Sequence, residues 1–110
     1  MLKIAIDIMG GDNSPEEPIY GIKSYIKENP ENNTFFYIVG NKKNALELID
    51  SAIPKEQYKI ISTTQKIEMH DKPSKILKEK PDSSMLRCVE LLRDCKANAM
   101  ISAGNTGALL

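Results

Sequence analysis

Short runs of apolar and β-branched residues alternate along the chain with segments of helical spacing, and this alternation constrains the fold more than any other feature. The runs that predict strands are residues 2–7, 34–39, 58–62 and 98–102. The patterns that predict helices are residues 14–29, 45–49 and 84–95. Strands that alternate with helices predict an α/β fold of the Rossmann-like type, in which helices cover both faces of a mainly parallel sheet in three layers.

The order of the strands predicts where a ligand would bind. If the first strand lies beside both the second and the fourth, the order across the sheet is 3-2-1-4, and the winding reverses between strands one and four. Ligands of open α/β sheets bind at such a reversal. Two glycine-rich segments, Met9–Asp12 and Ala103–Gly107, directly follow these two strands. We therefore expect the binding site where these two loops leave the sheet.

Length and charge narrow the class of protein. The 110 residues make one domain at most, and 108–110 resemble the first turn of a further helix, so we expect 1–110 to be the amino-terminal part of a longer α/β domain. Basic and acidic side chains number 15 each, which argues against a general nucleic-acid binder. No apolar run approaches the roughly 20 residues that span a bilayer, and the start lacks a signal-peptide pattern. A cytoplasmic protein is the expectation.

The two cysteines lie seven residues apart in a predicted helix. Their Cα atoms would be about 10 Å apart, which is too far for a disulfide. Neither Cys88 nor Cys95 has a second cysteine or a histidine at zinc-ligand spacing. We expect both to be small apolar residues on a buried helical face.

The segment Ser102-Ala103-Gly104-Asn105-Thr106-Gly107 combines two glycines, two hydroxyls and an amide directly before a predicted helix. Glycine lets the backbone approach a ligand closely, and the free N–H groups at a helix start favour an anion. The segment lacks the lysine and the glycine spacing of a P-loop. It is either a phosphate-binding loop or an ordinary turn in which Asn105 or Thr106 caps the helix.

Ser83 and Ser84 open the preceding predicted helix, close to Lys78 and Lys80. Their hydroxyls and N–H groups could surround an anion, with the lysines supplying charge. The alternative is simple capping by Ser83 and a solvated lysine face.

Two carboxylates, Asp7 and Asp12, flank the Gly10-Gly11 turn. Carboxylates repel an anionic ligand, so they could position a cation, orient the loop amides or accept a proton. Asp12 could also be an ordinary turn residue. The chain has no GxGxxG fingerprint, which argues against a nicotinamide nucleotide.

Four motifs occur in an order and spacing that resemble one known family. They are Asp7-x-Met9-Gly10-Gly11-Asp12, Ile67-Glu68-Met69 with Pro73, Ser83-Ser84-Met85 and Ser102–Leu109. The chain is similar over its whole length to the phosphate acyltransferases of bacterial phospholipid synthesis, which move a fatty acyl group from acyl carrier protein to inorganic phosphate. The resemblance implies a fold similar to phosphotransacetylases and isocitrate dehydrogenases. It also implies a homodimer at the inner face of the membrane, whose acyl phosphate product is used by a membrane glycerol-3-phosphate acyltransferase.

The resemblance makes Lys80, the Ser83-Ser84 pair and the loop 102–107 the equivalent positions, and a hypothetical mechanism then gives each motif residue a role. Because phosphate is itself the nucleophile in this mechanism, we expect neither a metal nor a cofactor. Asn105 would stabilise the oxyanion, and Lys80 would be its charge partner. The residues expected to bind phosphate are Ser83, Ser84, Ser102, Gly104, Thr106 and Gly107. The residues expected to order the loop are Asp7, Gly10, Gly11 and Asp12.

Two other classes of function stay open at this stage. One is a dehydrogenase on the related fold, which the missing fingerprint disfavours. The other is a non-catalytic module that binds acyl carrier protein or a membrane. Acyl carrier protein is acidic, and four lysines lie close enough in sequence to form a basic docking face: Lys72, Lys75, Lys78 and Lys80.

Overall fold

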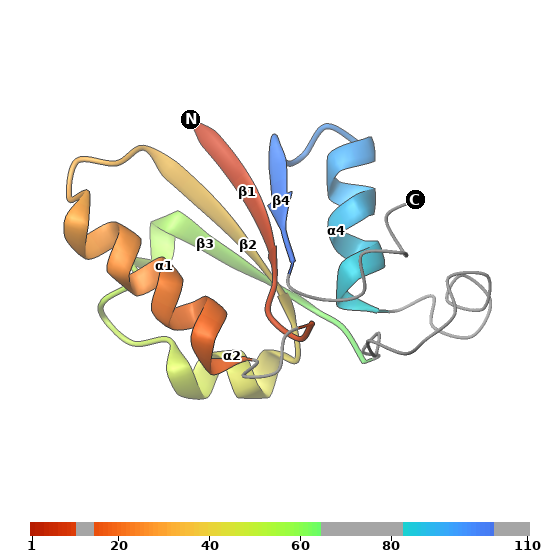
Figure 1. Cartoon of the computed structure of the whole chain (residues 1–110), viewed down its shortest axis with the longest axis horizontal. Helices are drawn as coiled ribbons and strands as arrows, with labels where there is room; N and C mark the ends of the chain where they lie inside the picture. The colour runs from red at the N-terminus through yellow and green to blue at the C-terminus, as the bar shows by residue number, and fades with distance from the viewer. Residues whose placement is uncertain (11–14, 65–82, 103–110) are drawn as a thin grey trace.

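A parallel four-stranded sheet with helices on both faces forms the molecule, as the computed structural model shows (Figure 1). The structure describes residues 1–10, 15–64 and 83–102. The elements in chain order are β1 (Leu2–Asp7), α1 (Glu16–Glu28), β2 (Thr34–Gly40), α2 (Lys42–Leu48), the 3-10 turn η1 (Lys55–Gln57), β3 (Tyr58–Ser62), α4 (Ser84–Arg93) and β4 (Ala99–Ile101). This arrangement confirms the predicted α/β class.

The strands lie in the order β3-β2-β1-β4, and every neighbouring pair is parallel. This order confirms the predicted 3-2-1-4 arrangement. The strand bounds differ slightly at two places, since β2 includes Gly40 and β4 is confined to Ala99–Ile101. Asn98 lies outside β4 because its side-chain oxygen accepts a hydrogen bond from the Lys3 N–H at 2.8 Å and thereby closes the end of the β1–β4 pair.

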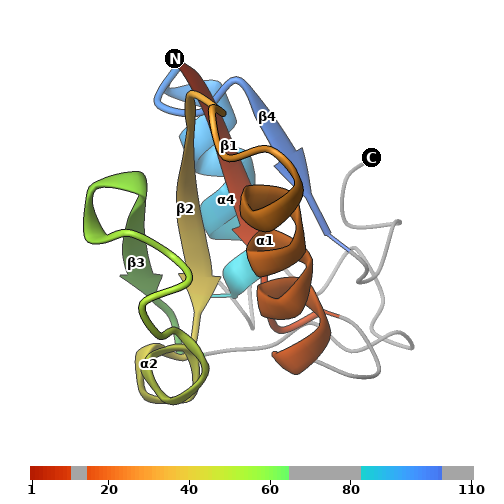
Figure 2. The same cartoon turned by 90° about the vertical axis from the view of Figure 1, so that its left-hand side faces the viewer.

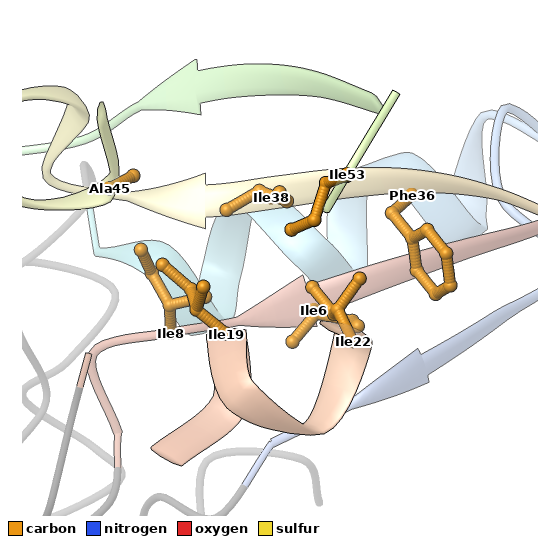
Figure 3. Packing of buried hydrophobic residues seen from close by; sticks show 8 residues of the cluster. All are labelled: Ile6, Ile8, Ile19, Ile22, Phe36, Ile38, Ala45 and Ile53. Carbon is orange, nitrogen blue, oxygen red and sulfur yellow. The ribbon is translucent and has the colours of Figure 1, made fainter. Parts of the chain in front are cut away.

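Alternation along β1 separates the two faces of the sheet. In Figure 2, α1 lies in front of the strands and α4 behind them. Ile6 and Ile8 point to the face covered by α1 and α2, where the larger core lies (Figure 3). The buried members of this cluster are Ile6, Ile8, Ile19, Ile22, Phe36, Ile38, Ala45 and Ile53. Because side chains in a strand alternate, Ala5 and Asp7 point to the opposite face.

The core on the α4 face is smaller. Its buried members are Ala5, Val39, Cys88 and Ala97. Met85 and Cys88 are three residues apart on α4, so both face the sheet, and both are buried. The helix α4 therefore covers the face of the sheet from which Asp7 projects.

The prediction that both cysteines lie on a buried helical face is wrong for Cys95. Cys88 is buried as expected, but α4 ends at Arg93 and Cys95 is exposed. The Cys95 backbone has φ 59°, and the N–H of Lys96 returns to the carbonyl of Leu91 at 2.9 Å. This is the pattern of a left-handed helix terminator, and it turns Cys95 away from the apolar face. Both cysteines are free, as the spacing predicts.

The helix α1 lies inside the predicted range of 14–29. Pro15 occupies the N-cap position and gives no side-chain hydrogen bond to the helix. Ser14, where the predicted range begins, lies outside the described residues. Glu16 and Glu17 lie in the first turn, where the positive end of the helix dipole favours negative side chains.

Gly40 ends β2 where β1 passes close to it. A methyl group at Gly40 would lie 2.5 Å from Ile8 Cγ1 and 2.8 Å from Met9 Cγ, and Ile8 is fully buried. We expect Gly40→Ala to lower the free energy of unfolding by about 1–3 kcal/mol, because the core must shift to admit the methyl group. Urea denaturation measures this change.

The matched control is Gly21→Ala on α1, where the added methyl group meets nothing within 4 Å. Alanine in a helix is expected to leave stability unchanged or to raise it by about 0.5–1 kcal/mol. Equal losses in the two variants would contradict the close approach at Gly40.

Candidate functional site

Asp7 joins three segments at the carboxyl edge of the sheet. Its Oδ1 accepts a hydrogen bond from Ser84 Oγ at 2.5 Å and another from the Met9 N–H at 2.9 Å. Its Oδ2 accepts a hydrogen bond from Ser102 Oγ at 2.8 Å. The Asp7 side chain is buried, with 3% of its surface exposed. Residues 77 and 95 positions away in the sequence thus share one carboxylate.

The fold explains why these residues meet. β1 and β4 are parallel neighbours in which Ile6 pairs with Ile101, so Ser102 emerges beside Asp7. On the same face of the sheet, α4 begins at Ser84. Parallel strands all end at the same edge, and the winding of this sheet reverses between β1 and β4. The network therefore lies at the predicted binding position.

Ser83 and Ser84 play different parts at the start of α4. Ser83 is the N-cap, and its Oγ accepts a hydrogen bond from the Leu86 N–H at 3.3 Å. This bond uses the oxygen of Ser83 as an acceptor, whereas Ser84 donates its hydrogen to Asp7. Both side chains are buried. The structure thus shows the capping that the sequence offers for Ser83, whereas anion binding by either serine stays a prediction.

The hydrogen-bond directions restrict what the serines can donate to a ligand. An ionised carboxylate is an acceptor only, and a serine hydroxyl carries one hydrogen. While Ser84 and Ser102 donate to Asp7, they offer other groups only lone pairs. The expectation that these two hydroxyls bind phosphate stays a prediction, and donation to phosphate would require them to leave Asp7.

Cys88 lies one helical turn after Ser84 and adds a neutral group beneath the network. Its thiol is fully buried. Burial chiefly, and the charge of Asp7 in addition, raise the pKa of the Cys88 thiol well above its usual range. The thiol therefore stays protonated near neutral pH, and it is not suited to act as a nucleophile.

Other predicted site residues divide into two groups. Gly10 is described and is buried just after β1, on the predicted glycine turn. Seven fall outside the described residues: Gly11, Asp12, Lys80, Gly104, Asn105, Thr106 and Gly107. The basic docking face at Lys72, Lys75, Lys78 and Lys80 also falls there. Their roles stay predictions.

One polar residue at this edge of the sheet was not predicted. Thr63 directly follows β3, is 5% exposed, and its hydroxyl has no hydrogen-bond partner among the described residues. The available signal was its position, because a hydroxyl directly after a parallel strand lies at the edge where ligands bind. Its main-chain N–H donates to the Gly40 carbonyl at 2.8 Å, so the residue is held against β2.

Neither a metal site nor a membrane span is found among the described residues. No group of three or more His, Cys, Asp or Glu side chains in 1–10, 15–64 and 83–102 is placed to hold a metal ion. Within those same ranges, none of the helices has the length and apolar character needed to cross a membrane.

Comparison with known proteins gives a consistent match over the whole chain. The model of a family described as "Fatty acid synthesis protein" matches residues 2–110. A protein of Lactobacillus acidophilus named "Phosphate acyltransferase" is 40% identical over 110 residues, which are 100% of this chain and 32% of the relative. Proteins with the same name from Oenococcus oeni and Clostridioides difficile are 43% and 41% identical, over 97% and 99% of this chain and 30% and 32% of the relatives. The chain thus spans about a third of the length of these curated relatives.

Proposed function

Because this chain belongs to the fatty acid synthesis protein family, we propose that it is the amino-terminal part of an enzyme that transfers a fatty acyl group from acyl carrier protein to inorganic phosphate. The relatives that match 97–100% of the chain carry the name "Phosphate acyltransferase". The product would be an acyl phosphate, an activated acyl donor for phospholipid synthesis.

The observation that carries the proposal is the Asp7 network. It brings the end of β1, the end of β4 and the first turn of α4 to one position, at the reversal of winding. The first turn of a helix presents main-chain N–H groups without intrahelical partners, which favour an anion. The loop that follows Ser102 carries the glycines that would let its backbone approach the same anion.

In this proposal the enzyme works chiefly by positioning. A phosphate oxygen attacks the carbonyl carbon of the thioester, a C–O bond forms, the C–S bond breaks, and the carrier thiol leaves with a proton. Holding phosphate against the carbonyl makes a bimolecular step effectively unimolecular. The main-chain N–H groups of 104–107, Thr106 and Ser83 hold the phosphate, while Asn105 donates to the developing oxyanion and Lys80 supplies positive charge.

The same proposal names the partners of the enzyme. They are acyl carrier protein, phosphate and a second copy of the protein. The acyl phosphate passes to a membrane glycerol-3-phosphate acyltransferase, so the enzyme works in the cytoplasm, peripherally at the inner face of the membrane.

A direct assay tests the proposal. Purified full-length protein is incubated with palmitoyl-acyl carrier protein and radiolabelled phosphate, and the label that moves into acyl phosphate is counted after extraction. We expect labelled acyl phosphate to form only when enzyme, phosphate and palmitoyl-acyl carrier protein are all present. Loss of thioester without acyl phosphate would indicate a hydrolase, and no consumption of thioester would refute acyl transfer altogether.

A further inference from the structure

We infer that Asp7 is a positioning residue of this site: its carboxylate holds the first turn of α4 and the end of β4 against β1 through Ser84 and Ser102. The inference rests on the proposed function, and it assigns Asp7 neither contact with phosphate nor proton transfer. It makes the two serine hydroxyls the link between Asp7 and the loops that hold the substrate.

The contacts of Asp7 indicate a structural role, because they join segments that are far apart in the sequence. One carboxylate connects three segments that are separated by 77 and 95 positions in the sequence. A buried charge is costly unless it is hydrogen-bonded, and bonds to an ionised acceptor are stronger than bonds between neutral groups. Here both oxygens are occupied, Oδ1 by Ser84 and Met9 and Oδ2 by Ser102.

The same contacts argue against a role in proton transfer. A general base must reach the proton that it accepts, directly or through one water. Asp7 is 3% exposed, and its two oxygens face donors from the protein. Its negative charge would also repel phosphate at close range. Among the described residues no cation contacts Asp7, and its carboxylate accepts hydrogen bonds from two hydroxyls and one N–H.

A mutant cycle on the full-length protein separates the two roles. The variants are Asp7→Asn, the double variant Ser84→Ala/Ser102→Ala, and the triple variant that combines them. We expect Asp7→Asn to lower kcat/KM for acyl phosphate formation by about a hundredfold, the scale of a displacement near 1 Å in an active site. The double variant should lose a similar amount. The triple variant should be no more than about threefold worse than the double, because contacting residues that act as one unit are not additive.

Two controls accompany the cycle. Asp94→Asn removes an exposed carboxylate that pairs with Arg93 at 3.1 Å, at the far end of α4, and it should leave the rate unchanged. The pH profile of Asp7→Asn should keep the shape of the wild-type profile, since no catalytic proton is removed. A lost limb of the profile, or effects that multiply in the triple variant, would overturn the inference in favour of proton transfer by Asp7.

Amide hydrogen exchange gives a readout that does not depend on activity. Asp7→Asn should speed exchange of the Met9 N–H and of the first turn of α4, while Asp94→Asn should leave both unchanged. If wild-type protein forms no acyl phosphate, the proposed function fails, and exchange alone decides the positioning role. Unchanged exchange, or an active Asp7→Asn within about threefold of wild type, would refute it. Should Asp7→Asn not fold, the serine double variant carries the same exchange test.

Discussion

Full-length protein in which Asn105 is replaced by Ala is expected to form acyl phosphate about a hundredfold more slowly, the scale on which the loss of one oxyanion donor lowers turnover. The attack of phosphate on a thioester places negative charge on the carbonyl oxygen. A fixed amide N–H aimed at that oxygen stabilises the transition state more than the substrate, so the loss should fall on kcat more than on KM. Initial rates over a range of palmitoyl-acyl carrier protein concentrations separate kcat from KM.

Asn33→Ala is the matched control for this variant. Asn33 is exposed and precedes β2, at the edge of the sheet opposite to the site. Its replacement should leave both kcat and KM unchanged. A normal rate for Asn105→Ala would remove Asn105 from the mechanism and leave main-chain N–H groups as the remaining oxyanion donors.

The largest expected loss of stability comes from Ile38→Ala. Ile38 lies in β2, between β1 and β3, and its side chain is fully buried in the cluster beneath α1 (Figure 3). Removal of its methyl and methylene groups loses the free energy of burying them and leaves a cavity. The free energy of unfolding should therefore fall by about 2–5 kcal/mol. Chemical denaturation, followed by circular dichroism, gives the difference.

Leu46→Ala provides the comparison, because Leu46 lies on α2 with half of its surface exposed. Its removal should change stability by less than about 0.5 kcal/mol, as is usual for surface positions. A loss at Ile38 no larger than the loss at Leu46 would mean that the core on this face is not packed as described.

The fold could be predicted because local patterns and the rules of parallel sheets agree. Strands such as Tyr58–Ser62 are short and bounded by turn residues, and their alternation with helices permits few topologies. Cys95 was misplaced because helical spacing continues through it in the sequence. The helix ends earlier since the Lys96 N–H bonds to Leu91, and this contact leaves no sign in a pattern of apolar residues.

The site could be predicted only in part. Its position follows from strand order, and its residue types from motifs. Which atoms meet could not be read from the sequence: Asp7 and Ser102 are 95 positions apart, and their contact depends on the register of β4 against β1. Alternation along β1 would have placed Asp7 opposite Ile6 and Ile8, toward α4. It does not show that Ser84 and Ser102 both donate their hydroxyl hydrogens to the Asp7 carboxylate.

The position of bound phosphate tests the central claim most directly. A crystal structure of the full-length protein grown with inorganic phosphate should show the anion at the carboxyl edge of the sheet, between β1 and β4. Its oxygens should lie within about 3.2 Å of main-chain N–H groups at the start of α4 and in the loop after Ser102, with Asp7 bonded to the serines and not to the anion. Phosphate bound away from this edge, or direct contact between Asp7 and the anion, would contradict the account.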